Sequence, residues 1–230
     1  MDGLKELVKR LEKTYDEEEQ IQVLQSICRT ILNEYVIDIQ GEIIEPLRVE
    51  AYYYPFNEPE KFNDPCAHKS EKKIRNYGKV YFIEERYGYP GIDICLSLGD
   101  YYLSFLVKNS RVGKNYHKQM DLYDRFVDRR DEIETQDVLK KVENNKKIVF
   151  NTARVGISKS KTKFAKEPLA ALIEMESNGN YTFERGFGKG KAVIEYISNH
   201  ENIFASNEQK IEFARKYAGY CPETIKKGEV

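Results

Sequence analysis

The N-terminal part of the chain has the hydrophobic spacing of two amphipathic helices. Apolar residues recur three or four positions apart within residues 4–11 and again within residues 21–35. The acidic run Asp16–Glu19 precedes the second stripe, at the place where negative charge stabilises a helix N-terminus. We therefore expect two helices before residue 35, each with one apolar face toward a core.

The pattern then changes to short segments that are typical of β-strands. The strands predicted between residues 35 and 107 are Tyr35–Ile39, Leu47–Tyr54, Lys79–Ile83, Ile92–Leu96 and Tyr102–Val107. Residues 55–77 connect two of these strands. This connection is longer than a compact domain needs, so it is a candidate functional loop.

The second half of the chain goes from helix to strand and back to helix. The charged segment 115–145 has a helical pattern, strands are expected at Ile148–Ile157 and Leu169–Met175, and helices are expected near Ala192–Ser198 and Asn207–Ala218. Because strands and helices do not alternate regularly, the order favours an α+β fold with a mixed, largely antiparallel sheet and flanking helices. We divide the chain into an N-terminal helical extension (1–34), a central domain (35–176) and a C-terminal helical extension packed on the same domain (177–230).

Composition limits the class of protein. The chain has 230 residues, of which 40% are hydrophobic, so it can bury a core, and its formal net charge is only −1. No stretch reaches the roughly 18 apolar residues that span a bilayer, and the N-terminus has the pattern of a charged amphipathic helix rather than of a signal peptide. We therefore expect a cytoplasmic protein without a membrane partner. The four cysteines and three histidines lack metal-ligand spacing, so no metal site and no cofactor is predicted.

Glu50 is a carboxylate in a segment that otherwise has the pattern of a half-buried strand, directly before the aromatic run Tyr52–Tyr54. A carboxylate among core side chains costs several kcal/mol unless it is paired, solvated or protonated. Two interpretations stay open. Glu50 is either a structural ion-pair partner of Arg48 or a downstream lysine, or a general base that activates water beside an aromatic-lined slot.

Two basic clusters depart from the overall charge balance. Lys69–Lys79 contains five basic residues and one acid, and Thr152–Lys166 contains five basic residues and no acid. One such run is typical of a solvated face, but the two together, interleaved with aromatic and hydroxyl side chains, suit contacts with nucleic-acid phosphates. The predicted phosphate contacts within the clusters are Lys72, Lys73, Arg75, Arg154, Lys159 and Lys161.

Several short motifs, taken in order, resemble those of the alkyladenine (3-methyladenine) DNA glycosylases. They are Val49–Tyr52 (VEAY), Cys66–His68 (CAH), Arg75-Asn76, Gly78–Tyr81 (GKVY), Ile92–Ile94 (IDI), Ala153–Ile157 (ARVGI) and Phe164–Leu169 (FAKEPL). The resemblance covers roughly residues 30–176, with a divergent middle. It implies a curved sheet and an enzyme that acts on a base flipped out of DNA.

The resemblance implies roles for three residues. Glu50 matches the glutamate that deprotonates the water attacking C1′ of the sugar. Tyr52, two residues further on and therefore on the same strand face, matches the tyrosine that stacks on the flipped base. His68 matches a residue that lines the base pocket.

Asp93 departs from the family pattern, because the family has an asparagine there that screens the edge of the purine. An ionised aspartate accepts hydrogen bonds but donates none. Asp93 is therefore expected to favour a base that presents an amino group and to repel a carbonyl or anionic edge.

Other matches are displaced or ambiguous. Ile83 stands where the family has a second aromatic wall, which suggests an unusual or bulky base. The side chain that enters the helix in place of the flipped nucleotide falls near Arg86 or Tyr87. The basic residue beside the catalytic water falls on Lys108, with Arg111 as the other candidate.

The leading hypothesis from the sequence is a monofunctional, metal-free DNA glycosylase without a Schiff-base intermediate, with DNA as its partner. The first alternative is a catalytically inactive nucleic-acid-binding module of the same fold. The second is a protein-interaction platform built on the terminal helices.

Overall fold

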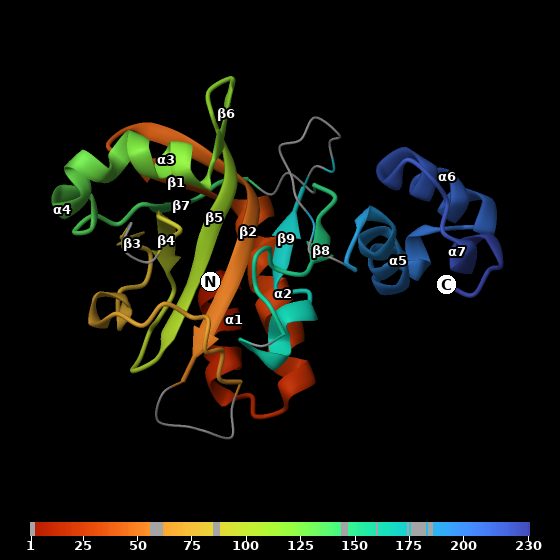
Figure 1. Cartoon of the computed structure of the whole chain (residues 1–230), viewed down its shortest axis with the longest axis horizontal. Helices are drawn as coiled ribbons and strands as arrows, with labels where there is room; N and C mark the ends of the chain where they lie inside the picture. The colour runs from red at the N-terminus through yellow and green to blue at the C-terminus, as the bar shows by residue number, and fades with distance from the viewer. Residues whose placement is uncertain are drawn as a thin grey trace.

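The computed structural model describes residues 3–55, 62–84, 88–143, 147–159, 161–173, 175, 183 and 186–230. Within these residues the chain has a mixed α+β fold, in which a curled antiparallel sheet forms a half-barrel with helices packed around it (Figure 1). The predicted α+β class with a curved, largely antiparallel sheet is therefore confirmed. No helix in these ranges is both long and apolar enough to cross a bilayer.

The order of elements follows most of the hydrophobic pattern. The helices are α1 (Gly3–Lys13), α2 (Glu17–Glu34), α3 (Gln119–Phe126), α4 (Arg130–Ile133), α5 (Lys189–Asn199), α6 (Asn207–Ala218) and α7 (Glu223–Lys226). The strands are β1 (Tyr35–Ile39), β2 (Glu42–Tyr54), β3 (Val80–Ile83), β4 (Gly91–Cys95), β5 (Tyr102–Val112), β6 (Asn115–Lys118), β7 (Leu139–Lys141), β8 (Phe150–Thr152) and β9 (Ala170–Leu172). The strand order is β3-β4-β5-β2-β1-β7, with β6 beside β5 and with β9 between β2 and β8.

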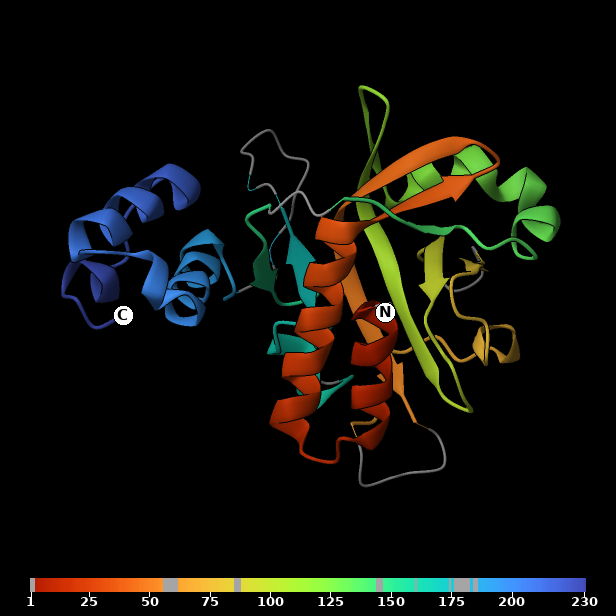
Figure 2. The ribbon, with the colours of Figure 1, turned by 180° about the vertical axis from the view of Figure 1, so that it is seen from behind.

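The two N-terminal helices cover one face of the sheet, where they lie side by side (Figure 2). Asp16 caps α2 by accepting a hydrogen bond from the backbone N–H of Glu19 at 2.8 Å. Leu4 of α1 and Leu24 of α2 belong to the same apolar cluster as Val49 of the sheet. The segment predicted as an N-terminal extension therefore shares the core of the sheet over residues 3–34.

The C-terminal helices α5, α6 and α7 lie to one side of the half-barrel (Figure 1) and form a second apolar cluster. This cluster includes Phe150 of β8 and Leu172 of β9. The ring of Phe150 lies 5.3 Å from that of Tyr196 and 6.1 Å from that of Phe213, measured between centroids. The helices thus attach to the sheet through its β8–β9 edge. The four-residue α7 was not predicted, because so short a helix has no detectable period.

The prediction of a helical segment over 115–145 was only partly right. Its middle forms α3 and α4, but its ends form β6 and β7, which pair with β5 and β1. Gly113, with φ of +60°, turns the chain from β5 into β6, a conformation that glycine adopts without strain. The strands expected at 148–157 and 169–175 are also shorter, since β8 and β9 have three residues each.

Candidate functional site

The polar side chains of β2 lie on the face of the sheet opposite α1 and α2. Val49 belongs to the apolar cluster that the two helices cover. Side chains alternate along a strand, so Glu50 has the opposite direction and Tyr52 shares its face. The hydrogen bond from the Tyr52 hydroxyl to the Glu50 carboxylate confirms the predicted placement of both residues on one face.

The register extends this polar face across four strands. Glu50 of β2 is paired with Leu106 of β5, Leu106 with Asp93 of β4, and Asp93 with Tyr81 of β3. Residues paired across strands share a face of the sheet. Four strands therefore bring Glu50, Asp93 and Tyr81, which are distant in sequence, into one row.

The Glu50 carboxylate is fully buried, with 0% of its surface exposed. One oxygen, Oε2, accepts a hydrogen bond from the Tyr52 hydroxyl at 2.9 Å and lies 4.0 Å from Nζ of Lys108. The other, Oε1, accepts from the backbone N–H of Val155 at 3.0 Å and lies 3.9 Å from Nη2 of Arg48. The buried charge is thus both hydrogen-bonded and flanked by two cations, as burial of a carboxylate requires.

Arg154 covers the ring of Tyr52, with its guanidinium carbon 4.7 Å from the ring centroid. The guanidinium is itself buried, and it donates hydrogen bonds to the Asp64 carboxylate and, at 3.3 Å, to the carbonyl oxygen of Ala51. Burial and the neighbouring charge of Glu50 raise the pKa of Tyr52 well above its usual range. The phenol is therefore a neutral donor to Glu50.

A second buried ion pair lies on the same face. Nζ of Lys73, which is 0% exposed, lies 2.6 Å from Oδ2 of Asp93 and donates to the backbone oxygen of His68 at 3.1 Å. The hydroxyl of Ser104 donates to the same Asp93 oxygen at 3.1 Å. Ser104 of β5 lies opposite Tyr52 of β2 in the strand register. The Lys73–Asp93 ion pair and the Glu50 carboxylate with its flanking cations are therefore neighbours on this face.

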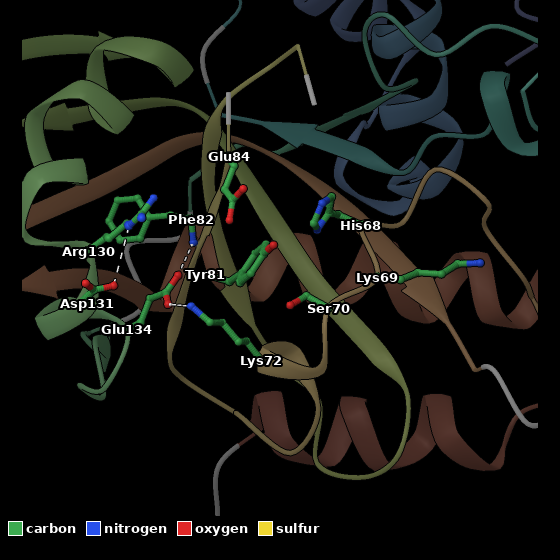
Figure 3. Close-up of a pocket in the computed structure, with 10 residues that line it drawn as sticks. All are labelled: His68, Lys69, Ser70, Lys72, Tyr81, Phe82, Glu84, Arg130, Asp131 and Glu134. Carbon is green, nitrogen blue, oxygen red and sulfur yellow. Dashed lines mark hydrogen bonds and ion pairs between the residues drawn. The ribbon is translucent and has the colours of Figure 1, made fainter. Parts of the chain in front are cut away.

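A pocket of about 350 Å³ opens beside the edge strand β3 (Figure 3). The rings of His68 and Tyr81 stack in its wall, with centroids 5.3 Å apart. Its rim carries ion pairs, such as that between Lys72 and Glu134 at 2.7 Å (Figure 3). The lining residues are His68, Lys69, Ser70, Lys72, Tyr81, Phe82, Glu84, Arg130, Asp131 and Glu134. His68 therefore lines a pocket, but Glu50 is not among the residues that line it.

The structure separates the two candidates for the basic residue beside Glu50. Lys108 approaches the carboxylate because an irregularity in the β2–β5 register inserts it between the paired residues Val107 and Asn109. Arg111 instead forms a salt bridge with Glu45, in which Nη2 of Arg111 lies 2.8 Å from Oε2 of Glu45. Lys108 is therefore the better candidate.

Two of the predicted phosphate contacts need correction, because Lys73 and Arg154 are buried and paired with carboxylates inside the fold. They are not surface cations. Lys72 is exposed and bonded to Glu134, and Arg75 is exposed and bonded to Asp100 at 2.8 Å. Lys159 and Lys161 are exposed in the segment between β8 and β9.

The remaining predicted positions are less informative. Ile83 is partly buried at the end of β3. Arg86 and Tyr87, the predicted wedge into the DNA helix, lie outside the described residues.

Sequence reasoning missed three groups that complete the site, namely the Asp64 carboxylate, the Ser104 hydroxyl and the backbone N–H of Val155. Asp64 carries a weak signal, because it is an acid in the long loop just before the CAH motif. Ser104 becomes visible only when the register of β5 against β4 is known. A backbone N–H carries no signal in a sequence.

Within the described ranges, no group of three or more histidine, cysteine, aspartate or glutamate side chains is arranged to hold a metal ion. The polar groups gathered at the site are the carboxylates of Glu50 and Asp93, the hydroxyls of Tyr52 and Ser104, and cationic side chains. No protein-family model matches this chain, and no curated protein matches its sequence.

Proposed function

We propose that this protein is a monofunctional DNA glycosylase whose fold is like that of the alkyladenine DNA glycosylases. It flips a damaged or modified base out of DNA, binds that base against Tyr52 and hydrolyses the N-glycosidic bond, leaving an abasic site. The observation that carries the proposal is the surroundings of Glu50. Its carboxylate lies on the polar face of the sheet between the Tyr52 hydroxyl, the Val155 N–H and the ammonium group of Lys108.

In the proposed reaction Glu50 accepts a proton from water while the water oxygen bonds to C1′ of the sugar. The departing base takes the electron pair of the N-glycosidic bond. Positive charge develops on the sugar, and the negative charge of Glu50 stabilises it. Hydrogen bonds from Tyr52 and Val155 fix the orientation of the carboxylate before the substrate arrives.

The segment that follows β8 connects this chemistry with DNA binding. It carries Val155, which holds Glu50, and the exposed cations Lys159 and Lys161. Cations at the mouth of a base pocket contact the phosphates beside the flipped nucleotide. Binding of the DNA backbone would thereby act on the same segment that positions the catalytic carboxylate.

The proposal requires this segment to move when DNA binds. Glu50 has no exposed surface, and the Arg154 guanidinium covers the ring of Tyr52. A flipped base that stacks on that ring takes the place of the guanidinium. Stacking of one base on an aromatic ring contributes about 1–3 kcal/mol, which offsets part of the cost of displacing Arg154.

The test is release of bases from oligonucleotides that contain methylated, deaminated or hypermodified bases, measured by mass spectrometry under single-turnover conditions. We expect Glu50→Gln to lower the rate by about 100-fold or more, because a positioned general base contributes about 10²–10⁴ in rate. The matched control is Glu45→Gln, which makes the same change on the same strand at a residue paired with Arg111. Base release by Glu50→Gln at the parental rate would refute the mechanism. Trapping with borohydride tests for a Schiff base, and none is expected.

A second candidate function is a nucleic-acid-binding module that lacks catalysis. The complete burial of Glu50, with both oxygens hydrogen-bonded inside the fold, favours it. DNA binding that weakens with salt, together with no base release over the whole panel and equal behaviour of the parent and Glu50→Gln, would select this candidate.

A further inference from the structure

The hairpin formed by β5 and β6 concentrates positive charge outside the two basic clusters of the sequence. Residues 108–119 contain three lysines, one arginine and one histidine and no acidic residue. With the histidine neutral, the segment has a formal charge of +4, whereas the whole chain has a charge of −1. A local charge of this size attracts an anionic partner even when the net charge of the protein is close to zero. The basic residues are Lys108, Arg111, Lys114, His117 and Lys118.

The hairpin is accessible to a partner. It projects beyond the rest of the sheet in both views of the ribbon (Figure 1 and Figure 2). Among the described residues, β6 pairs with β5 alone. Lys114, Asn115 and Lys118 are exposed, and 42% of the surface of Tyr116 is accessible. A large ligand can therefore contact the hairpin along its length.

One side of the hairpin continues the polar face of the sheet. Val112 packs against the apolar core, so its neighbour Arg111 has the opposite direction along β5. Arg111 is paired with Tyr116 of β6, and residues paired across strands share a face. Side chains two residues apart on a strand also share a face, so Lys118 has the same direction as Tyr116. Cations of the hairpin therefore lie on the face that carries Glu50.

Lys108 connects the hairpin with the Glu50 carboxylate. Its Nζ lies 4.0 Å from Oε2 of Glu50, and the next residue, Asn109, is paired with Lys118. From Lys108 to Lys114 an extended chain covers roughly 20 Å, at about 3.3 Å per residue. One strand of DNA has a phosphate about every 3.4 Å along the helix axis, so this length corresponds to about six nucleotides. The hairpin is thus long enough to follow a DNA strand away from the site.

Arg111 braces the hairpin against β2. Its Nε and Nη2 donate hydrogen bonds to Oε2 of Glu45 at 2.9 and 2.8 Å, and its Nη1 donates to the Tyr116 hydroxyl at 3.4 Å. Glu45 also forms an ion pair with Lys147. Because one carboxylate is shared by two cations, the base of the hairpin keeps a positive charge.

We propose that the β5–β6 hairpin is an arm that binds the phosphates of the DNA strand beside the flipped nucleotide, with Lys114 and Lys118 as the cations that contact them. Lysine and tyrosine side chains are among those that bond phosphate oxygens. Protein partners are instead held by buried apolar anchors, and residues 113–118 contain no aliphatic apolar side chain. The inference rests on the proposed function, since it takes DNA as the partner and Glu50 as the site that the strand leaves.

The test measures binding of the full-length protein to a short unmodified DNA duplex by fluorescence anisotropy, over a range of salt concentrations. Lys114→Gln with Lys118→Gln is expected to weaken binding about tenfold or more at about 0.1 M salt. The slope of log K against log salt should fall by about 2, because each phosphate contact contributes about 0.9. Lys114→Arg with Lys118→Arg keeps both charges and should bind as the parent does.

The matched control is Lys9→Gln with Lys13→Gln, which makes the same change of net charge on exposed residues of α1, behind the apolar face of the sheet. We expect it to keep the parental slope. Equal weakening in the control and in the hairpin variant would mean that only net charge matters, and would overturn the inference. Displacement of the duplex by polyglutamate as readily as by unlabelled duplex would assign the arm to an acidic protein and also overturn it.

The outcomes separate this inference from the proposed function. Weaker DNA binding by the hairpin variant, together with no base release by the parent, supports the inference and refutes the glycosylase. Base release by the parent, together with a parental salt slope in the hairpin variant, supports the glycosylase and overturns the inference. Failure of the parent to bind the duplex also overturns the inference.

Discussion

Protonation of Glu195 is expected to make the stability of this protein depend on pH near neutrality. Glu195 lies on α5 where the C-terminal helices meet α2, and its Oε1 accepts a hydrogen bond from Gln25 at 3.4 Å. Burial raises the pKa of this carboxyl from 4.5 to about 7, and the charge of Glu167 adds to the effect while Lys191 and Arg29 oppose it. The folded protein therefore holds a proton that the unfolded chain releases.

The direction and size of this pH effect on the free energy of unfolding follow from the linkage between proton binding and folding. Below about pH 4.5 the carboxyl is protonated in both states, so it does not disfavour folding. Between about pH 4.5 and 7 the unfolded chain ionises first, and the free energy of unfolding falls as the pH rises. A rise in pKa from 4.5 to about 7 corresponds to at most about 3 kcal/mol, fully expressed above about pH 7, and partial exposure of the side chain reduces it.

Glu195→Gln removes this ionisation and keeps the shape of the side chain. We expect the variant to be more stable than the parent at pH 8.5, by up to about 3 kcal/mol, and nearly equal to it at pH 4.5. Because the chain contains no tryptophan, urea unfolding is best followed by circular dichroism. Glu201→Gln, an exposed change just beyond the same helix, is the matched control and should show no such difference between the two pH values. A Glu195→Gln variant that is no more stable than the parent at pH 8.5 would refute the argument.

Three further predictions concern stability. Leu24→Ala creates a cavity between α2 and the sheet and is expected to cost about 2–5 kcal/mol in urea unfolding, whereas a cost under 1 kcal/mol would place Leu24 outside the core. Phe150→Ala removes the ring that joins β8 to α5 and α6. Limited proteolysis should then cleave the region after residue 186 faster than residues 3–143, and equal rates of cleavage in the two regions would contradict this prediction. Asp64→Asn leaves the Arg154 guanidinium buried without its carboxylate and should lower the free energy of unfolding by about 3–5 kcal/mol. The double variant with Arg154→Met should recover most of this loss. If it does not, the unpaired charge of Arg154 is not the cause of the loss.

The sequence was most informative where one periodicity extends over a whole element. The strand Tyr35–Ile39 was predicted with its observed bounds, because it is rich in aromatic and β-branched residues, and Tyr35, Ile37 and Ile39 are buried at every second position. The same period placed Glu50 and Tyr52 on one face. The period did not show whether Lys108 or Arg111 is the basic residue beside Glu50. Lys108 reaches Glu50 through an irregularity in the β2–β5 register, and this irregularity depends on how two strands distant in sequence pair.

Buried cations were the main failure of sequence reasoning. Lys73 and Arg154 lie within runs of basic residues, so their pattern is that of a solvated surface. Their carboxylate partners are 20 and 90 residues away in sequence, and only the folded sheet brings the charges together. Local charge therefore predicted the exposure of Lys159 and Lys161 but not the burial of their neighbour Arg154.

The buried charges of the sheet lie together on one of its faces. Within the described part of the chain, Glu50 with Arg48, Asp64 with Arg154 and Asp93 with Lys73 form three buried acid–base pairs around Tyr52. Burying such a pair costs several kcal/mol per ion, and well-packed apolar residues stabilise a fold equally well or better. The opposite face of the same sheet, covered by α1 and α2, has an apolar core of that kind. The ion pairs around Tyr52 on the other face are therefore not required for stability alone, and we propose that they serve the base site of the proposed function.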